Sequence, residues 1–215
     1  MKYIVLLGDG MADLPLEELG GKTPLQAART PNMDRLARGG KMGQVRTIPE
    51  AFPPGSDVAN LSVLGYDPVK YFTGRAPLEA ASMGVELGPQ DVAFRCNLVT
   101  IEDETMVDFS AGHIGSDEAR RLISDLAREL MDGDLSFHPG VSYRHLMVWR
   151  NGKDGARCTP PHDITGQEIG SFLPKGGGAE RLKTLMQESR RILANHPVNG
   201  DRLSRGDRPA TSIWL

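Results

Sequence analysis

The stretch YIVLLGDG, residues 3–10, decides the expected fold class. An apolar run closed by glycine is typical of a strand that is buried on both faces of a sheet. A strand of this kind delivers the loop after it to the surface, which places Asp9 at the C-terminal end of the strand. The sequence therefore predicts an α/β fold that opens with a buried strand, a loop and a helix.

The residues after this strand are typical of short helices separated by loops. Thr30 and Pro31 predict a helix with proline at its first position, and Gly39 and Gly40 predict its end. Residues 45–48 suggest a second short strand, after which a proline-rich loop leads to a second helix. Ser56 is expected at the N-terminus of that helix.

From residue 92 the pattern changes to alternation. Apolar residues at 92, 94, 96 and 98 alternate with Arg95 and Asn97, which predicts an antiparallel strand with a hairpin return through residues 106–109. A helix from Ser116, a strand over residues 141–149 and a last helix that ends before Pro197 are expected to follow.

The last six residues, ATSIWL (210–215), begin what looks like an apolar strand. Chains seldom end by exposing isoleucine, tryptophan and leucine together. Two interpretations follow. Either this tail docks on the core as a final edge strand, or the chain is cut within a longer protein.

Composition and charge exclude several classes of protein. The chain has 39% hydrophobic and 25% charged residues, and no apolar run approaches the roughly 20 residues that span a bilayer. Its net charge of −3 gives no broad attraction to nucleic acid. Cys96 and Cys158 are too few for a disulfide framework, so we expect reduced thiols in a cytoplasmic protein without a signal peptide.

Asp9 and Ser56 are candidates for a metal ligand and a nucleophile, and each has an ordinary alternative. Most aspartates at a strand end cap a loop or a helix, although hard cations bind carboxylate oxygen. A serine at a helix start is often only an N-cap, although the same helix end offers free N–H groups and a positive dipole to a phosphate. A hydroxyl nucleophile needs activation at neutral pH, and metal coordination supplies it.

Several spaced motifs resemble one family. Residues 8–40, GDGMADLPLEELGGKTPLQAARTPNMDRLARGG, are similar to the archaeal-type cofactor-independent phosphoglycerate mutases of the alkaline phosphatase superfamily. The resemblance continues in the same order to the end of the chain, through PPGSDVANLSVLGYDP, FTGRAPLEAASMG, AFRCNLVTI, MVDFSAGHI, GVSYRHLMVW, TPPHDITG, LANHPVN and RPATSIWL. Several motifs together are far more specific than any one of them.

This resemblance implies roles for the two candidates. It makes Asp9 a metal-binding aspartate, and Ser56 the serine that accepts the phosphoryl group and binds a divalent ion. It implies an isomerase of glycolysis and gluconeogenesis that interconverts 3-phosphoglycerate and 2-phosphoglycerate through a phosphoserine, with manganese, magnesium or zinc as cofactor. The expected partner is a small phosphorylated substrate, not nucleic acid or a membrane, and the oligomeric state is left open.

Seven further side chains are candidates for binding the substrate. An extended strand puts Arg95 and Asn97 on one face, and an arginine fork suits the phosphate and carboxylate groups of phosphoglycerate. Ordinary alternatives exist, because an arginine can simply cover a sheet and His145 can be a satisfied, partly buried histidine. The candidates are Arg95, Asn97, His113, Arg144, His145, His162 and Asp163.

The resemblance also implies a domain organisation. Residues 1–91 correspond to part of an alkaline-phosphatase-like core, residues 92–195 to an inserted α+β domain, and residues 196–215 to a segment that returns toward the rest of the core. Full members of the family continue with a second half that carries further metal-binding aspartates and histidines, whereas His196 is the only histidine after Asp163 here.

We therefore expect an incomplete portion of the enzyme that is inactive alone and poorly occupied by metal. One alternative is a related phosphotransferase that acts on another small alcohol such as homoserine. The other is a non-catalytic domain that binds a phosphorylated ligand.

Overall fold

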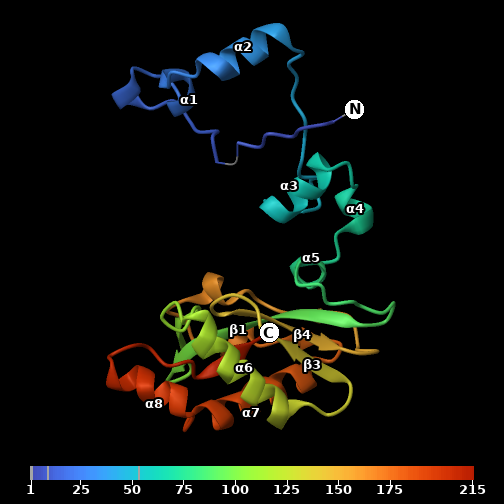
Figure 1. The fold of residues 1–215 in the computed structure, drawn as a ribbon, viewed down its shortest axis with the longest axis vertical. Helices are drawn as coiled ribbons and strands as arrows, with labels where there is room; N and C mark the ends of the chain where they lie inside the picture. Colours follow the sequence, from blue (N-terminus) through green and yellow to red (C-terminus); the bar gives the residue numbers. More distant parts are fainter. Residues whose placement is uncertain (1, 9, 53) are drawn as a thin grey trace.

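The computed structural model describes residues 2–8, 10–52 and 54–215 (Figure 1). Up to residue 91 these residues form short helices joined by loops, and from Val92 on they form a sheet covered by helices. None of the helices in these ranges has both the length and the apolar character needed to cross a bilayer.

The helices of the first part are all short. They are η1 (Glu17–Leu19), α1 (Pro24–Ala27), α2 (Pro31–Gly39), α3 (Ser56–Val63), α4 (Pro68–Tyr71) and α5 (Arg75–Ser82). Proline occupies the first position of α2, where its missing N–H costs nothing and its fixed φ suits a helix. The predicted starts of α2 and α3 are both confirmed.

The second part is built on an antiparallel sheet with the order β2-β1-β4-β3, in which β7 also pairs with β1. Its strands are β1 (Val92–Glu102), β2 (Thr105–Asp108), β3 (Leu135–His138), β4 (Arg144–Trp149) and β7 (Ser212–Trp214). A separate two-stranded ribbon joins β5 (Ala156–Arg157) to β6 (Lys175–Gly176). The antiparallel sheet and the β1–β2 hairpin predicted from the alternation are confirmed.

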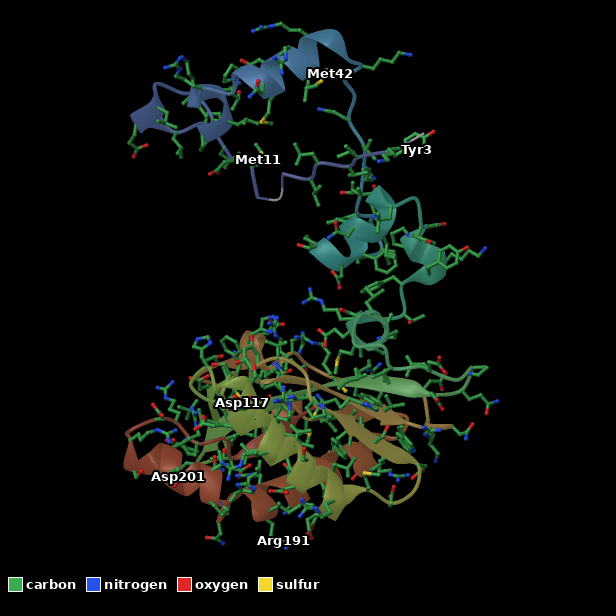
Figure 2. The ribbon with its side chains drawn as sticks, viewed as in Figure 1. Tyr3, Met11, Met42, Asp117, Arg191 and Asp201 are labelled. Atoms are coloured by element: carbon green, nitrogen blue, oxygen red, sulfur yellow. The ribbon has the colours of Figure 1, made fainter. Side chains whose placement is uncertain are left out.

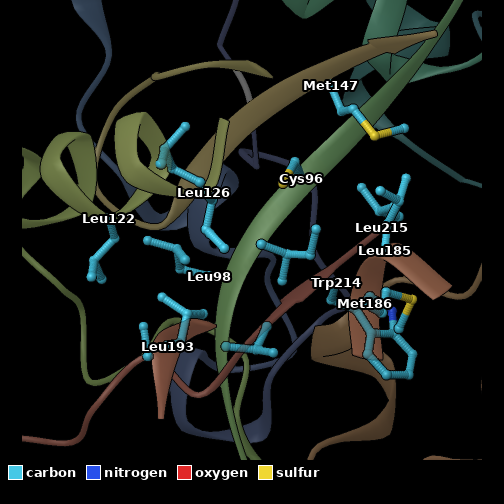
Figure 3. Packing of buried hydrophobic residues seen from close by; sticks show 14 of the residues in the cluster. Cys96, Leu98, Leu122, Leu126, Met147, Leu185, Met186, Leu193, Trp214 and Leu215 are labelled. Carbon is cyan, nitrogen blue, oxygen red and sulfur yellow. The ribbon is translucent and has the colours of Figure 1, made fainter. Parts of the chain in front are cut away.

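Helices cover both faces of this sheet. The helices of the second part are α6 (Ser116–Leu130), α7 (Ala179–Leu193) and α8 (Pro197–Ser204), with the short helices η2 (Pro161–Ile164) and η3 (Gly170–Phe172) in the loops. Cys96 and Leu98 of β1 pack in one large cluster with residues of α6 and α7 (Figure 3), whereas α5 packs against Leu146 and Val148 on the opposite face. Charged side chains such as Arg191 of α7 lie on the outer surface (Figure 2).

Two boundaries differ from the prediction for local reasons. The helix α6 starts at Ser116 as expected, but Gly115 is its cap and the Ser116 hydroxyl accepts the N–H of Ser142 at 3.0 Å. The strand predicted over residues 141–149 starts only at Arg144. Ser142 has a φ of +55°, which is incompatible with an extended strand.

The C-terminal tail docks on the core, as the first of the two interpretations predicts. Its residues Ile213, Trp214 and Leu215 are all buried, and β7 pairs with β1 with Leu98 opposite Ile213. The buried hydroxyl of Ser189 on α7 accepts the N–H of Ile213 at 2.9 Å. The tail is therefore part of the same core as the rest of the sheet.

The strand predicted over residues 3–7 is not formed. These residues are extended but highly exposed, with 91% of Ile4 and 87% of Leu6 accessible, and residues 45–48 also form no strand. A strand is stable only when neighbouring strands satisfy its N–H and C=O groups and cover its side chains. Within the described residues, no strand lies beside residues 3–7 to do so.

Candidate active site

Ser56 is the first residue of α3, after Gly55 as the N-cap, and its side chain is exposed. The first N–H groups of a helix have no partner within the helix, so this end of α3 presents donors and a positive dipole beside the hydroxyl. A Cβ atom on Gly55 would collide with the Asp57 carboxylate, which explains the glycine before the serine. The predicted placement of Ser56 at a helix N-terminus is confirmed.

The start of α3 also takes part in an ion pair that the sequence patterns do not predict. Arg75, the first residue of α5, lies 2.8 Å from the Asp57 carboxylate through its Nε atom. Burial of the Asp57 carboxyl raises its pKa, but the hydrogen bonds from Arg75 and from backbone N–H groups outweigh burial and lower the pKa. The pair holds the start of α3 next to the start of α5, and no local pattern connects two residues so far apart in sequence.

A cleft of about 970 Å³ lies between the Ser56 segment and the sheet. Gly55 and Asp57, the neighbours of Ser56, are among its lining residues. Further lining comes from residues 72–77, from β1, from the loops around residues 154–163 and from the C-terminal tail. It includes four of the predicted candidates: Arg95, Asn97, His162 and Asp163.

Arg95 and Asn97 face this cleft because alternate residues of β1 point to the same side of the sheet. The Arg95 Nε atom lies 2.9 Å from Oε1 of Glu79 on α5, but no hydrogen bond forms at this Nε, so the contact is a charge pair. Asn97 is 4% exposed, and its Oδ1 atom has no partner within the described residues. A buried acceptor without a donor is costly, so Asn97 is suited to accept a hydrogen bond from a ligand in the cleft.

His162 and Asp163 lie next to each other in η2. The His162 Nε2 atom is 3.3 Å from Asp163 Oδ1, and both side chains are partly exposed. The His162 ring also meets Phe109 edge to face, with 6.2 Å between the ring centres. His162 therefore connects the cleft to an aromatic cluster.

That cluster holds two further candidates. The ring of His113 lies 6.4 Å from Tyr143 and 6.5 Å from Phe109, and the Arg144 guanidinium lies 5.6 Å from the Tyr143 ring. Arg144 is the cross-strand neighbour of Asn97, which lines the cleft. His113 and Arg144 are thus at one end of the candidate site, although neither of them lines the cleft itself.

His145 lies on the opposite face of the sheet. It pairs with Cys96 on the core side, is 1% exposed and accepts the N–H of Gly140 at Nδ1 over 3.0 Å. Its Nε2 atom has no partner within the described residues. The structure does not bring His145 to the cleft, and this placement agrees with the alternative of a buried core histidine.

The burial of His145 predicts a dependence of stability on pH. Burial lowers the pKa of the His145 imidazole from 6.5 to about 4, so between these values the unfolded chain binds a proton that the folded chain does not. The stabilisation is complete above about pH 6.5 and is lost as the pH falls toward 4, by up to about 3 kcal/mol. Urea unfolding across this range is expected to show the loss.

A His145→Asn variant keeps an acceptor for the Gly140 N–H but cannot titrate, so its unfolding free energy is expected to change less over the same pH range. His113→Asn, at an exposed position, serves as the matched control and should retain the wild-type dependence. Equal pH dependence in wild type and His145→Asn would contradict the assignment.

The described residues do not form a complete metal site. Asp9, the predicted metal ligand, lies outside the described residues, and in residues 2–8, 10–52 and 54–215 no three His, Cys, Asp or Glu side chains converge. Divalent ions take about four to six ligands in proteins. Ser56 is the one predicted metal ligand among the described residues. It therefore does not supply enough ligands to hold a divalent ion.

Comparisons with known proteins agree with the sequence resemblance. The family described as 2,3-bisphosphoglycerate-independent phosphoglycerate mutase matches residues 37–199. The chain is 62% identical over 219 residues to a probable 2,3-bisphosphoglycerate-independent phosphoglycerate mutase of Geobacter sulfurreducens, covering 100% of this chain and 55% of that protein. It is 56% identical to the Methanosarcina mazei protein of the same description over 216 residues, 100% of this chain and 54% of that protein.

Two solved structures are also similar. A cofactor-independent phosphoglycerate mutase from Thermoplasma acidophilum has a TM-score of 0.58 and 31% identity over 95% of this chain and 55% of its own. A protein from Pyrococcus horikoshii has a TM-score of 0.70 and 30% identity over 96% of this chain and 48% of its own. The chain spans about half the length of the curated relatives it matches. This α/β chain belongs to the 2,3-bisphosphoglycerate-independent phosphoglycerate mutase family and corresponds to its N-terminal half.

Proposed function

We propose that this chain carries the phosphoryl-accepting serine and part of the substrate site of a phosphoglycerate mutase that interconverts 3-phosphoglycerate and 2-phosphoglycerate. The observation that supports this proposal is the cleft, which is lined by the neighbours of Ser56 and by Arg95, Asn97 and His162. A helix N-terminus beside a hydroxyl favours a bound phosphate, and an arginine fork favours a carboxylate.

The proposed reaction has two transfers. In the first, a bond forms between phosphorus and the Ser56 oxygen while the bond from phosphorus to the 3-hydroxyl oxygen breaks. The serine proton leaves, and the freed substrate oxygen gains a proton. In the second, a bond forms between phosphorus and the 2-hydroxyl oxygen while the bond from phosphorus to the Ser56 oxygen breaks. The 2-hydroxyl loses its proton, and the Ser56 oxygen regains one. The glycerate must stay bound between the two transfers, which requires groups that hold its carboxylate and hydroxyls.

Arg95 and Asn97 are proposed to hold the glycerate. Among the described residues, the Arg95 guanidinium forms an ion pair only with Glu79. The N–H groups on its other edge can therefore donate to a substrate carboxylate. The orphan Oδ1 atom of Asn97 can accept a hydrogen bond from a substrate hydroxyl. His162 is proposed to donate to the phosphate, with Asp163 orienting its imidazole, and His113 and Arg144 extend this site at its aromatic end.

We also propose a divalent ion, manganese, magnesium or zinc, that takes most of its ligands from outside the described residues. A hydroxyl nucleophile is activated by such an ion in related chemistry. The compartment proposed is the cytoplasm. The proposed domain organisation is a core part over residues 1–91, an inserted domain over 92–195 and a return segment over 196–215, with this last segment packed in the same core as β1.

Phosphopeptide mapping tests the proposed intermediate. The protein, in the length that its gene encodes, is mixed with 3-phosphoglycerate and a divalent ion, quenched in acid and digested. We expect one added phosphate group on the peptide that contains Ser56, because the intermediate is a phosphate ester of this hydroxyl. Glycerate without phosphate is the control and should add nothing. Phosphate on a different serine would refute the assignment.

A further inference from the structure

A second cleft, of about 440 Å³, lies beside the C-terminal end of α5. It shares only Asp91 with the cleft near Ser56. Its polar lining includes Ser136 and His138 of β3 and Arg150, which follows β4. None of these three residues has a role in the function proposed above.

Strand alternation brings these side chains together. On β3, Leu135 and Phe137 are buried in the main core, so Ser136 and His138 point to the opposite face. Ser136 lies opposite Val148, which packs against α5, and Arg150 follows two residues later in the same direction. The Arg150 N–H donates to the Asp134 carbonyl at 2.7 Å, so the strand pairing extends to this residue. Three polar side chains therefore share one patch of the sheet.

Arg150, Ser136 and His138 can each donate a hydrogen bond to a negative ligand in this cleft. The Ser136 Oγ and His138 Nε2 atoms are 3.0 Å apart, and Arg150 has no carboxylate within 4.0 Å among the described residues. Burial lowers the pKa of His138, and the Arg150 charge lowers it further, so the neutral form of the imidazole is favoured while no anion lies beside it.

Two carboxylates, those of Asp91 and Glu86, also line this cleft, and neither forms an ion pair with Arg150 among the described residues. Both carboxylate oxygens of Asp91 accept backbone N–H groups, from Gly88 at 2.9 Å and from Asn151 at 3.1 Å. Glu86 is exposed and forms no ion pair with Arg150 in the described parts of the chain. The Arg150 charge therefore acts on Asp91 without a direct ion pair, and among the described residues its guanidinium remains available to a ligand beside the Ser136 hydroxyl and the His138 imidazole.

We propose that this second cleft binds a small molecule through its phosphate or carboxylate group, with Arg150 as the counter-charge and Ser136 and His138 as hydrogen-bond donors. The guanidinium can donate two parallel hydrogen bonds to such a group. Val85 and Val148 line the same cleft and offer apolar contact to a short carbon chain. The volume lies within the range of small-molecule sites.

Histidine ring resonances in NMR test this proposal directly. The protein in its encoded length is labelled at histidine and titrated with inorganic phosphate in one arm and acetate in the other, and His138→Gln assigns the resonance. We expect a saturable shift of the His138 resonance in at least one arm. We also expect a higher pKa of His138 in the bound state, because an anion stabilises the imidazolium in the presence of Arg150, Asp91 and Glu86.

Matched variants decide between this site and general ionic effects. Arg150→Gln is expected to weaken the binding at least tenfold, and Ser136→Ala to weaken it less, whereas Arg191→Gln on the outer side of α7 should leave it unchanged. Arg150 and Arg191 are both exposed, so neither change removes core packing. A shift that stays linear with concentration in both arms, or that saturates equally in Arg150→Gln, would overturn the proposal. Mutase activity does not enter this readout.

Discussion

Ser56→Ala is expected to reduce mutase activity by about 10⁴-fold or more, because it removes the atom to which the phosphoryl group is transferred. The Ser56 side chain is exposed at the start of α3, so the variant should fold normally. Alanine is also acceptable at the first position of a helix. Activity is measured by coupling 2-phosphoglycerate formation to a spectrophotometric assay, with the protein in its encoded length.

Ser82→Ala is the matched control for this loss. Ser82 is an exposed serine at the end of α5, on the same part of the chain, and it should keep wild-type activity. The Ser56→Ala variant is also expected to bind 3-phosphoglycerate with an affinity close to that of the wild type, because the Arg95 and Asn97 contacts remain. Activity of Ser56→Ala within tenfold of the wild type would show that another group accepts the phosphoryl group.

The alternation in β1 shows what could be predicted from the sequence. A period of two residues identified both the strand and the shared face of Arg95 and Asn97, and both side chains line the cleft. The same rule applies to Arg144 and His145. Both residues are predicted substrate contacts and neighbours in one predicted strand, yet strand geometry alone sends them to opposite faces, and His145 is in the core.

Other features depend on contacts that no local pattern contains. The Asp57–Arg75 pair joins two helices across a loop, and its partners are identified only when the chain is folded. Residues 3–7 have the pattern of a buried strand, but this pattern forms a strand only where a neighbouring strand pairs with it. Without a neighbouring strand among the described residues, these side chains remain exposed.

Trp214→Ala is expected to lower the free energy of unfolding by about 3–5 kcal/mol, the usual cost of truncating a fully buried tryptophan. Trp214 is 1% exposed, and its Nε1–H donates to the Thr159 carbonyl at 2.7 Å. The strand that carries it pairs with residues 97–99 of β1. Urea unfolding followed by circular dichroism measures the loss, and hydrogen exchange should show faster exchange of the β1 amides.

Trp214→Phe separates packing from the hydrogen bond. The phenyl ring retains most of the apolar contact but leaves the Thr159 carbonyl without its donor, so we expect a smaller loss of about 1–2 kcal/mol. Thr159 and Trp214 both line the cleft, and Thr159 precedes the loop that carries His162. If Trp214→Ala had the same urea midpoint of unfolding as the wild type, the Trp214 side chain of the tail would contribute nothing to the free energy of unfolding. The position of Asn97 in β1 would then depend on its pairing with Arg144 of β4.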